Sequence, residues 1–354
     1  VHLYDHESGP GKKFLVAGNG GLNLTHSENL EDFSKRYNKD ETFFFNAMKE
    51  FGPEDLRTWC HELGVETFIG TSGRVFPKKL KAAEILLTLR KKLEENPDFQ
   101  LHLKHKLINL SKDKTLFFAG PNGSLEVKAS AVILALGGGS WAKTGSDGKW
   151  ISLMEKLGIR TAPLLPMNCG FISSWSKFFQ ENVERLPLKN VVLKFGDRVI
   201  KTEIMITPYG IEGTGVYALS AEIRNKILNE GKATLHLDLK PDWSHEKVVE
   251  KIGTKKSKDS LSNFFRKSYG IDKDLLNFIR EFVDKDSMNS VEKLSGLLKE
   301  CEIELTGIRP LDEAISTSGG VCFSELTESL EVKKISDLYI VGEMLDFEAP
   351  TGGY

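Results

Sequence analysis

Several stretches of the chain repeat apolar residues with the spacing of an amphipathic helix. Between Glu41 and Gly64, apolar side chains recur on successive turns, and Gly52-Pro53 interrupts them. We therefore predict two helices with a break between them. The same spacing predicts further helices over Lys78 to Leu93 and Val216 to Leu228.

Strands are predicted where apolar and polar residues alternate, as over Val1 to Asp5 and Gln100 to Leu110. Leu116 to Val127 predicts a hairpin around Gly120-Pro121-Asn122-Gly123. Ala129 to Leu136 is continuously apolar. We expect this strand to be buried on both faces, as in a parallel sheet covered by helices.

The pattern changes after Pro163 to short strands, and Trp243 to Glu300 is polar and helical. Beyond Glu302 the strand-and-glycine pattern returns, ending in Leu338 to Val341. We therefore predict an α/β fold in which a nucleotide-binding domain, residues 1–162 and 303–354, is interrupted by an inserted domain, residues 163–302.

The composition is typical of a soluble globular protein and favours an enzyme that acts on small molecules. The chain of 354 residues is 40% apolar and 28% charged with a net charge of −2, which gives no overall reason to expect nucleic acid or membrane as a partner. Its four cysteines form no C-x-x-C pair, which argues against a disulfide framework or a zinc site and favours the cytoplasm. No apolar run is long enough to span a bilayer.

Three glycine-rich segments follow predicted strands or lie close behind them: Gly18 to Gly21, Gly137 to Gly139, and Gly342 with Gly352-Gly353. Glycines at the carboxyl ends of strands let backbone amides approach a phosphate or a ring closely. Together the three segments indicate a nucleotide cofactor.

Asp5 ends the first predicted strand, where dinucleotide-binding sheets place an acidic residue on the adenosine ribose. An aspartate in such a turn is also commonly structural. Gly137 to Ala142 fits G-x-G-x-x-A, but no acidic residue ends a second strand at the right distance after it. We interpret it as a second contact to one cofactor.

The longer motifs resemble a known family, the BaiN-like or YhiN-like NAD(P)/FAD-dependent oxidoreductases of bacteria. The matching motifs occur in the family's order over nearly the whole chain: Gly11-Lys12-Lys13-Phe14-Leu15, Gly18 to Thr25, Leu136 to Ser140, Thr144-Gly145-Ser146, Gly307 to Leu311, Ser316 to Val321, Gly342 to Asp346 and Thr351 to Tyr354. The segment Gly20-Gly21-Leu22-Asn23 lacks the Arg-Cys pair that many members of the family carry there. This difference weakens any transfer of substrate specificity from those members to this chain.

The resemblance implies an FAD-binding, Rossmann-like domain of the glutathione-reductase type, interrupted by an inserted β-barrel-like and helical domain. It also implies that the intact protein has a first strand with a G-x-G-x-x-G loop before Val1 and a final helix after Tyr354. On that expectation, the chain without the loop binds FAD weakly, because the loop and the helix after it cradle the diphosphate.

Carried over residue by residue, the resemblance implies that Asp5 binds the adenosine ribose, that Lys106 and Leu107 lie against adenine, and that Glu343 meets the ribitol chain. The other cofactor-binding residues that it implies are Lys12, Lys13, Gly20, Gly21, Asn23, Thr25, Ala135, Gly137, Gly138, Thr317, Gly319, Gly320, Gly342, Gly352, Gly353 and Tyr354.

The resemblance implies an enzyme in which NAD(P)H reduces FAD, which in turn reduces a small organic acceptor such as a conjugated alkene. Tyr209 and Tyr217 are possible proton donors, and no catalytic acid is assigned. Two alternatives remain open: a flavin-binding electron-transfer or sensor protein, and an RNA-associated flavoprotein. For the second, Trp243 to Gly270 carries seven basic and three acidic residues.

Overall fold

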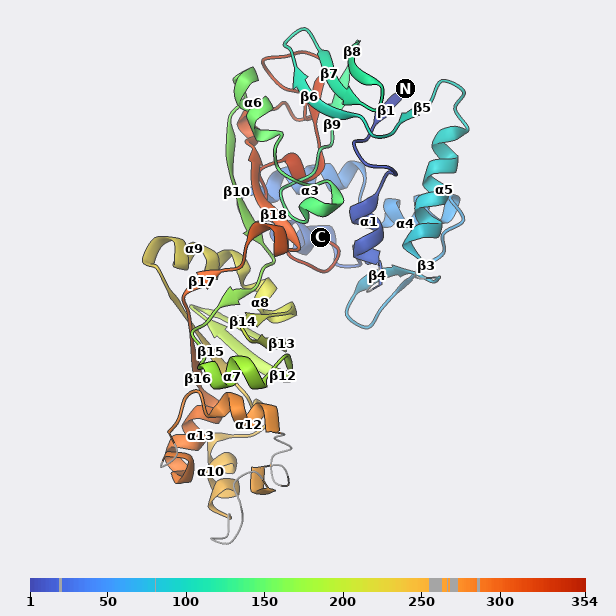
Figure 1. Cartoon of the computed structure of the whole chain (residues 1–354). Coiled ribbons are helices and arrows are strands. Elements are labelled where there is room, and N and C mark those ends of the chain that lie inside the picture. The colour runs from blue at the N-terminus through green and yellow to red at the C-terminus, as the bar shows by residue number, and fades with distance from the viewer. Residues whose placement is uncertain (19–20, 80, 255–262, 266, 268–272, 285–286) are drawn as a thin grey trace. The chain divides into compact units, whose positions relative to one another are not determined.

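The computed structural model describes residues 1–354 except 19–20, 80, 255–262, 266, 268–272 and 285–286. The described chain forms two compact units (Figure 1). Unit 1 comprises Val1–Met167 and Leu311–Tyr354, and unit 2 comprises Asn168–Pro310. The chain thus leaves unit 1, builds unit 2 and returns.

Unit 1 combines helices with five small sheets. Its helices are α1 (Lys12–Ala17), α2 (Leu30–Lys35), α3 (Glu41–Glu50), α4 (Pro53–Glu62), α5 (Ala82–Glu94) and α6 (Ile151–Leu157). Its strands are β1 (His2–Tyr4), β2 (Thr25–His26), β3 (Thr67–Ile69), β4 (Arg74–Pro77), β5 (Gln100–His102), β6 (Lys106–Leu110), β7 (Thr115–Gly120), β8 (Gly123–Lys128), β9 (Val132–Leu134), β10 (Thr161–Met167), β18 (Ser316–Val321) and β19 (Leu338–Ile340).

The pairing of these strands brings together segments that are distant in the sequence. β1 pairs with β5 and β9 with β19, both in parallel, whereas β10 pairs with β18 antiparallel. β2-β4-β3 and β6-β7-β8 are antiparallel sheets. The β9–β19 and β10–β18 pairs therefore join the first part of unit 1 to the part that returns after unit 2.

Several predicted elements of unit 1 are confirmed. The helix break at Gly52-Pro53 separates α3 from α4, with Pro53 at the first helical position of α4, where its missing N–H costs nothing. The predicted hairpin is the β7–β8 pair, which closes between Gly120 and Gly123. The predicted helix after Lys78 begins later, at Ala82.

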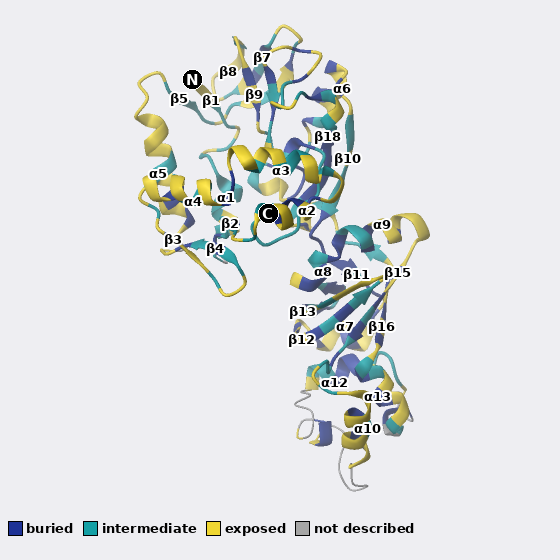
Figure 2. Cartoon of the chain, turned by 180° about the vertical axis from the view of Figure 1, so that it is seen from behind, coloured by how far each residue is buried: buried dark blue, intermediate teal, exposed yellow. Residues whose placement is uncertain are grey.

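The prediction of a strand buried on both faces was wrong. The strand β9 is only Val132–Leu134 and, within the described residues, has the single partner β19. Val132 and Leu134 are buried in the main core of unit 1, but the side chain between them, Ile133, is 69% exposed because successive side chains point to opposite faces. The apolar run from Ala129 to Leu136 therefore reflects burial of only one face of β9 (Figure 2).

The sequence pattern also missed α1. Its six residues are too few to show a helical period, and Gly18, which we placed in a loop close behind a strand, ends this helix as its C-cap. The first glycine segment therefore follows a helix rather than a strand.

Unit 2 is built on an antiparallel sheet of seven strands in the order β16-β15-β12-β13-β14-β11-β17. The two end strands, β16 (Cys301–Leu305) and β17 (Gly307–Ile308), are separated in the sequence only by Thr306. Because the ends of the order are neighbours along the chain, the sheet nearly closes into a barrel. The other strands are β11 (Phe171–Ile172), β12 (Leu186–Phe195), β13 (Arg198–Thr207), β14 (Gly210–Glu212) and β15 (Ala233–Asp238).

Helices complete unit 2: α7 (Lys177–Asn182), α8 (Thr214–Ala218), α9 (Ser220–Glu230), α10 (His245–Gly253), α12 (Lys273–Ile279) and α13 (Val291–Lys299). The last three lie in the stretch predicted to be helical, Trp243 to Glu300, whereas α8 and α9 stand where a single helix was predicted over Val216 to Leu228, and α7 was not predicted. Serines cap three of them, since the side chains of Ser176, Ser244 and Ser290 accept hydrogen bonds from the first turns of α7, α10 and α13. In the part of the chain that the structure describes, no helix has both the length and the apolar character needed to cross a membrane.

Candidate functional site

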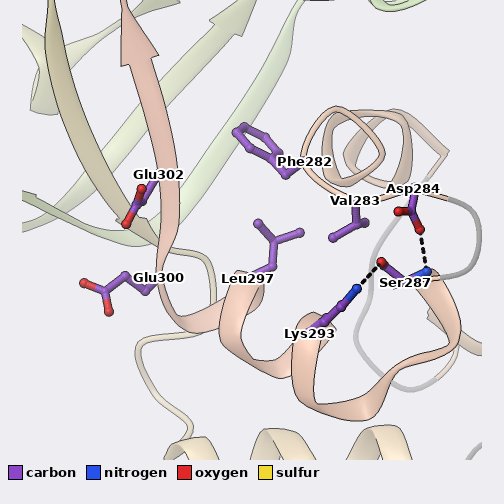
Figure 3. A pocket seen from close by; sticks show the side chains of 8 residues that line it. All are labelled: Phe282, Val283, Asp284, Ser287, Lys293, Leu297, Glu300 and Glu302. Atoms are coloured by element: carbon purple, nitrogen blue, oxygen red, sulfur yellow. Dashed lines mark hydrogen bonds between the residues drawn. The ribbon is translucent and has the colours of Figure 1, made fainter.

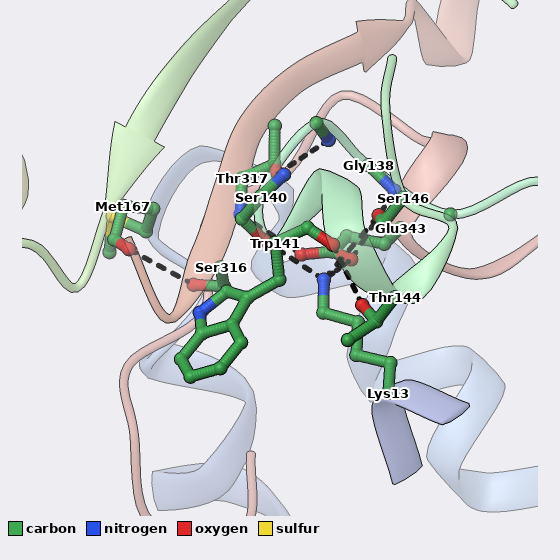
Figure 4. A network of polar contacts seen from close by, with 12 residues as sticks. Lys13, Gly138, Ser140, Trp141, Thr144, Ser146, Met167, Ser316, Thr317 and Glu343 are labelled. Carbon is green, nitrogen blue, oxygen red and sulfur yellow. Dashed lines mark hydrogen bonds and ion pairs between the residues drawn. The ribbon is translucent and has the colours of Figure 1, made fainter. Parts of the chain in front are cut away.

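A polar network joins the loop after β9 to β18 inside unit 1 (Figure 4). The hydroxyl oxygen of Thr317 accepts hydrogen bonds from the backbone amides of Gly139, at 2.9 Å, and Ser140, at 3.2 Å. A Cβ atom on Gly138 would lie 2.4 Å from this same hydroxyl. Only glycine therefore allows the loop to approach β18 so closely.

Glu343, just after β19, is the centre of this network. Its Oε1 accepts a hydrogen bond from the amide of Thr317 at 3.0 Å, and its Oε2 accepts one from the amide of Gly138 at 3.3 Å. Gly342, with φ of 68°, provides the left-handed turn that precedes it. One carboxylate thus ties the ends of two strands to the glycine loop.

Lys13 on α1 brings the first segment of the chain to the same point. Its Nζ lies 2.8 Å from Glu343 Oε2 and 2.9 Å from the hydroxyl of Ser140, and 3.5 Å from that of Ser146. The side chains of Lys13 and Glu343 are 33% and 23% exposed. This ion pair is sheltered but remains open to a ligand from solvent.

The C-terminal segment packs against the loop that follows α1. A Cβ atom on Gly353 would lie 2.3 Å from Asn23 Nδ2 and 2.5 Å from the backbone of Thr25. The hydroxyl of Tyr354 donates to Glu28 at 3.0 Å, and the Arg36 guanidinium lies over the Tyr354 ring at 5.5 Å.

Hydrogen bonding and burial shift the pKa values of Glu28 and Tyr354 in opposite directions. Its hydrogen bond with Arg36 lowers the pKa of Glu28, whereas burial, followed by the hydrogen bond to Glu28, raises the pKa of Tyr354 to about 12. Tyr354 therefore stays protonated, and Glu28 charged, at neutral pH.

Other predicted residues lie outside the network. Asp5 accepts a hydrogen bond from the amide of Glu7 at 2.8 Å, and Lys12 pairs with Glu7. Lys106 lies 3.8 Å from Asp147. The remaining members of this group are Leu107, half-buried in β6, Ala135, exposed after β9, Gly21, with φ of 102°, and Gly20, which lies outside the described residues.

The glycines of β18 make a second close approach. Gly319 and Gly320 both have positive φ, and a Cβ atom on them would lie 2.0 Å from Pro163 O and 2.4 Å from Met344 O. Gly137 carries a further contact, since its carbonyl accepts a hydrogen bond from the Trp150 indole at 2.8 Å.

The sequence reasoning missed Ser140 and Ser146 as site residues, although both lie in motifs that it identified. Ser140 and Ser146 are 0% and 5% exposed, and their hydroxyls face Lys13. A buried serine has to find a hydrogen-bond partner, but burial is not visible in the sequence, where the available signal was the position of both serines within the glycine motifs.

Unit 2 contains a separate hollow of about 510 Å³ beside α13 (Figure 3). Lys293 donates a hydrogen bond to Ser287 there at 2.8 Å, and Glu300 and Glu302 lie at its edge. It holds none of the predicted site residues, and no cluster of metal-ligating side chains occurs in the described part of the chain. The unit 1 network is therefore the better candidate site.

Comparison with known proteins identifies the family. All of residues 1–354 match the sequence model described as HI0933-like protein Rossmann domain. The chain belongs to this family. It therefore has the Rossmann-like FAD-binding fold that the resemblance implied, interrupted by the nearly closed sheet of unit 2.

The curated relatives include a reductase and two RNA-modifying enzymes. Over 368 residues the chain is 26% identical to 3-dehydro-bile acid delta(4,6)-reductase of Clostridium scindens, covering 100% of this chain and 88% of the relative. It is 23% identical over 367 residues to ribosomal RNA dihydrouridine synthase of Escherichia coli, with the same coverage. Family and relatives identify the chain as a flavin-dependent oxidoreductase that uses FAD.

Solved structures are more distant. Sdh1 of Mycobacterium smegmatis aligns with a TM-score of 0.42 and 12% identity, covering 99% of this chain and 64% of that one. The 3-ketosteroid delta1-dehydrogenase of Sterolibacterium denitrificans aligns with a TM-score of 0.37 and 13% identity, covering 93% and 68%. Similarities of this size are too weak to carry an argument about the site.

The network fits the polar part of FAD. A dinucleotide needs backbone amides and a cation for its diphosphate and acceptors for its hydroxyl groups. The network supplies an ammonium group on Lys13 as the cation and, as an acceptor, the carboxylate of Glu343, which the amides of Gly138 and Thr317 hold in place.

Proposed function

We propose that this oxidoreductase transfers a hydride from NADH or NADPH, through FAD, to a carbon–carbon double bond conjugated to a carbonyl group in a small organic molecule. The observation that carries the proposal is the network of Lys13, Gly138, Thr317 and Glu343, which joins segments at both ends of the chain around one polar point. The name of the Clostridium scindens relative, an alkene reductase, supports the type of acceptor.

In this proposal the protein residues bind and orient. Lys13 donates to the cofactor's phosphate oxygens, and Glu343, held in place by the amides of Gly138 and Thr317, accepts a hydrogen bond from a ribitol hydroxyl. Thr317 holds the amides of Gly139 and Ser140 in place, so that the loop keeps its shape when a ligand binds. Bound FAD supplies the hydride acceptor and donor.

The remaining cofactor contacts are extensions of the same proposal. Asp5 takes the adenosine ribose, Lys106 and Leu107 lie against adenine, and Gly319, Gly320 and the Gly352–Tyr354 segment lie near the flavin ring. We also propose that the protein works in the cytoplasm on a small-molecule substrate.

Steady-state kinetics test the proposal. The FAD-loaded protein should oxidise NADH or NADPH slowly alone and faster when a conjugated dienone is added, with one reduced double bond formed per nicotinamide consumed. A saturated ketone of the same skeleton is the matched control. A flavin that is reduced by neither nicotinamide, or nicotinamide oxidation that the dienone does not accelerate, would reject this function.

A second candidate acceptor is uridine in RNA. Two curated relatives, from Escherichia coli and Haemophilus influenzae, are named ribosomal RNA dihydrouridine synthase, at 23% and 21% identity. Uracil also carries a carbon–carbon double bond conjugated to a carbonyl. The bile acid reductase and the dihydrouridine synthases are therefore named for the same type of reduction. Incubation with ribosomal RNA and either nicotinamide, followed by mass spectrometry of nucleosides, detects the two added hydrogen atoms.

A further inference from the structure

Arg74 on β4 has a guanidinium group that no other side chain or backbone group engages. Within the described residues, neither a hydrogen bond nor an ion pair holds it, although the residue is partly buried. Each of the other arginines that the structure describes has a polar or aromatic partner, as Arg57 has in Glu54 and Arg309 in the ring of Tyr209. A guanidinium is permanently charged and carries five N–H donors, so Arg74 keeps its full capacity to bind an anion.

The C-terminal turn leaves one edge of this guanidinium uncovered. Gly352 has φ of 120°, and a Cβ atom on it would lie 3.4 Å from Nε and 3.7 Å from Nη2 of Arg74. These two nitrogens form the edge with which arginine binds a carboxylate or a phosphate through two parallel hydrogen bonds. Because residue 352 is glycine, no side chain of its own occupies the space in front of that edge.

Two other basic side chains lie beside Tyr354, and both are already engaged. His26 pairs with Arg74 across β2 and β4, and its ring stacks on that of Tyr354 at 5.0 Å. The His26 ring accepts a hydrogen bond at Nδ1 from the amide of Glu28, at 3.1 Å, and donates one from Nε2 to a backbone carbonyl, at 3.0 Å, so it is the neutral tautomer. Arg36 is paired with Glu28 at 2.5 Å. Of these three basic groups, Arg74 is the one that can take up a new anion.

We propose that Arg74 binds an oxyanion group, a carboxylate or a phosphate, on the molecule that this enzyme reduces. The inference rests on the proposed function, in which the Gly352–Tyr354 segment lies near the flavin ring. The acceptor has to lie against that ring to receive a hydride, so a cation beside Gly352 is within reach of it. Two parallel hydrogen bonds from Nε and Nη2 then fix the orientation of the conjugated double bond.

The test is a calorimetric titration of the oxidised, FAD-loaded protein without nicotinamide, because binding is then measured without turnover. Two matched pairs of probes distinguish the sources of the oxyanion: 4-oxocyclohex-2-ene-1-carboxylate with its methyl ester, and uridine 5′-monophosphate with uridine. We expect one charged probe to bind about tenfold or more tightly than its neutral partner. Preference for the carboxylate indicates a small organic acid as acceptor, and preference for the phosphate indicates a nucleotide.

Substitutions connect this preference to Arg74. Arg74→Gln should weaken binding of the charged probe by about 10- to 100-fold and leave its neutral partner unchanged. Arg74→Lys keeps the charge but loses the two-donor edge, so it should restore part of the affinity. Arg90→Gln, which breaks an exposed ion pair with Glu94 in the same unit, is the matched control and should bind both probes as the wild type does. Because Arg74 has no partner to lose, Arg74→Gln should unfold at the wild-type temperature.

Three results would overturn the inference: no binding of any probe at millimolar concentration, equal binding within both pairs, or a preference for the charged probe that Arg74→Gln retains. Loss of FAD affinity in Arg74→Gln would also overturn it, because the guanidinium would then serve the cofactor. Failure of the proposed function gives a different result: the charged probe binds through Arg74, but neither nicotinamide leads to its reduction.

Discussion

At the scale of single residues, Glu343 has the most concentrated role in the candidate site. Replacing it with alanine leaves the Lys13 ammonium and the amides of Gly138 and Thr317 without their acceptor. A hydrogen bond to a charged group contributes about 1.5–3 kcal/mol, so FAD affinity should fall by roughly one to two powers of ten. Titration of FAD into the apo variant measures this.

The control for this prediction is Glu126→Ala, on the exposed strand β8. Glu331 is unsuitable as the control residue, because its Oε1 accepts a hydrogen bond from the amide of Asp337 at 2.7 Å. Its substitution would therefore disturb the local backbone. Equal FAD affinities for Glu343→Ala and Glu126→Ala would remove Glu343 from the cofactor site.

Tyr37 gives a prediction about alkaline pH. It is 7% exposed, and burial raises its pKa to about 12, above the value of about 10 for an unfolded tyrosine. A group whose folded pKa is raised stabilises the fold below its unfolded pKa and loses that contribution as the pH rises through its folded pKa. Stability to urea should therefore fall between about pH 10 and pH 12.

The Tyr37→Phe variant isolates this contribution. Because phenylalanine has no proton to lose, its urea midpoint should fall less than that of the wild type over the same pH range. Tyr354, whose pKa is also raised to about 12, should account for part of the remaining fall. Identical pH profiles for the wild type and Tyr37→Phe would contradict the assignment.

At the scale of elements, β18 and the segment after β19 depend on close backbone approach. Gly320 has φ of 132°, and a Cβ atom there would lie 2.4 Å from the carbonyl oxygen of Met344. Because backbone atoms cannot move aside as a flexible side chain can, Gly320→Ala should destabilise unit 1 by more than about 2 kcal/mol. Thermal unfolding followed by circular dichroism measures this destabilisation.

Gly9→Ala is the matched control in the same unit, because a Cβ atom on Gly9 would meet nothing within 4 Å. It should leave the unfolding temperature almost unchanged. If Gly320→Ala unfolded at the temperature of Gly9→Ala, the close approach of β18 to Met344 would be wrong.

Local patterns predicted local elements well. The break between α3 and α4 followed from Gly52-Pro53, since proline excludes a continuous helix. Exposure was less predictable, because an apolar run such as Ala129 to Leu136 does not reveal which faces have partners, and Ile133 was exposed. The six-residue α1 was too short to give a periodic signal.

The candidate site could not be predicted from the periodicity of apolar residues, because it is formed by contacts between residues that are distant in the sequence. Lys13 and Glu343 are 330 positions apart in sequence, yet their side chains form an ion pair at 2.8 Å. Motif resemblance named both residues, but only the fold brought them together with Ser140 and Ser146. The buried amide of Asn23, which has no hydrogen-bond partner among the described residues, had no sequence signal, because its burial results from close packing against Gly353, 330 residues later in the chain.

At the scale of the whole molecule, charge distribution bears on the choice between a small acceptor and RNA. The chain has a net charge of −2, but unit 2 gathers cations around one aromatic ring. The ammonium groups of Lys240, Lys247 and Lys251 lie 6.0, 5.1 and 5.6 Å from the ring centre of Trp243. An aromatic ring among cations is typical of surfaces that bind single-stranded nucleic acid.

If RNA is the acceptor, this cluster should contribute to its binding. Trp243→Ala should weaken single-stranded RNA binding by about tenfold, because stacking of one base contributes roughly 1–3 kcal/mol. Replacing Lys247 and Lys251 with alanine should make the slope of log affinity against log salt concentration shallower by about 0.7 for each phosphate that is no longer neutralised. Fluorescence anisotropy with labelled RNA at several salt concentrations measures both, with Lys189→Ala, an exposed lysine on β12, as control. If none of these substitutions changes the affinity for RNA, the Trp243 cluster does not bind RNA. If the protein binds no RNA at all, the small conjugated alkene remains as the acceptor.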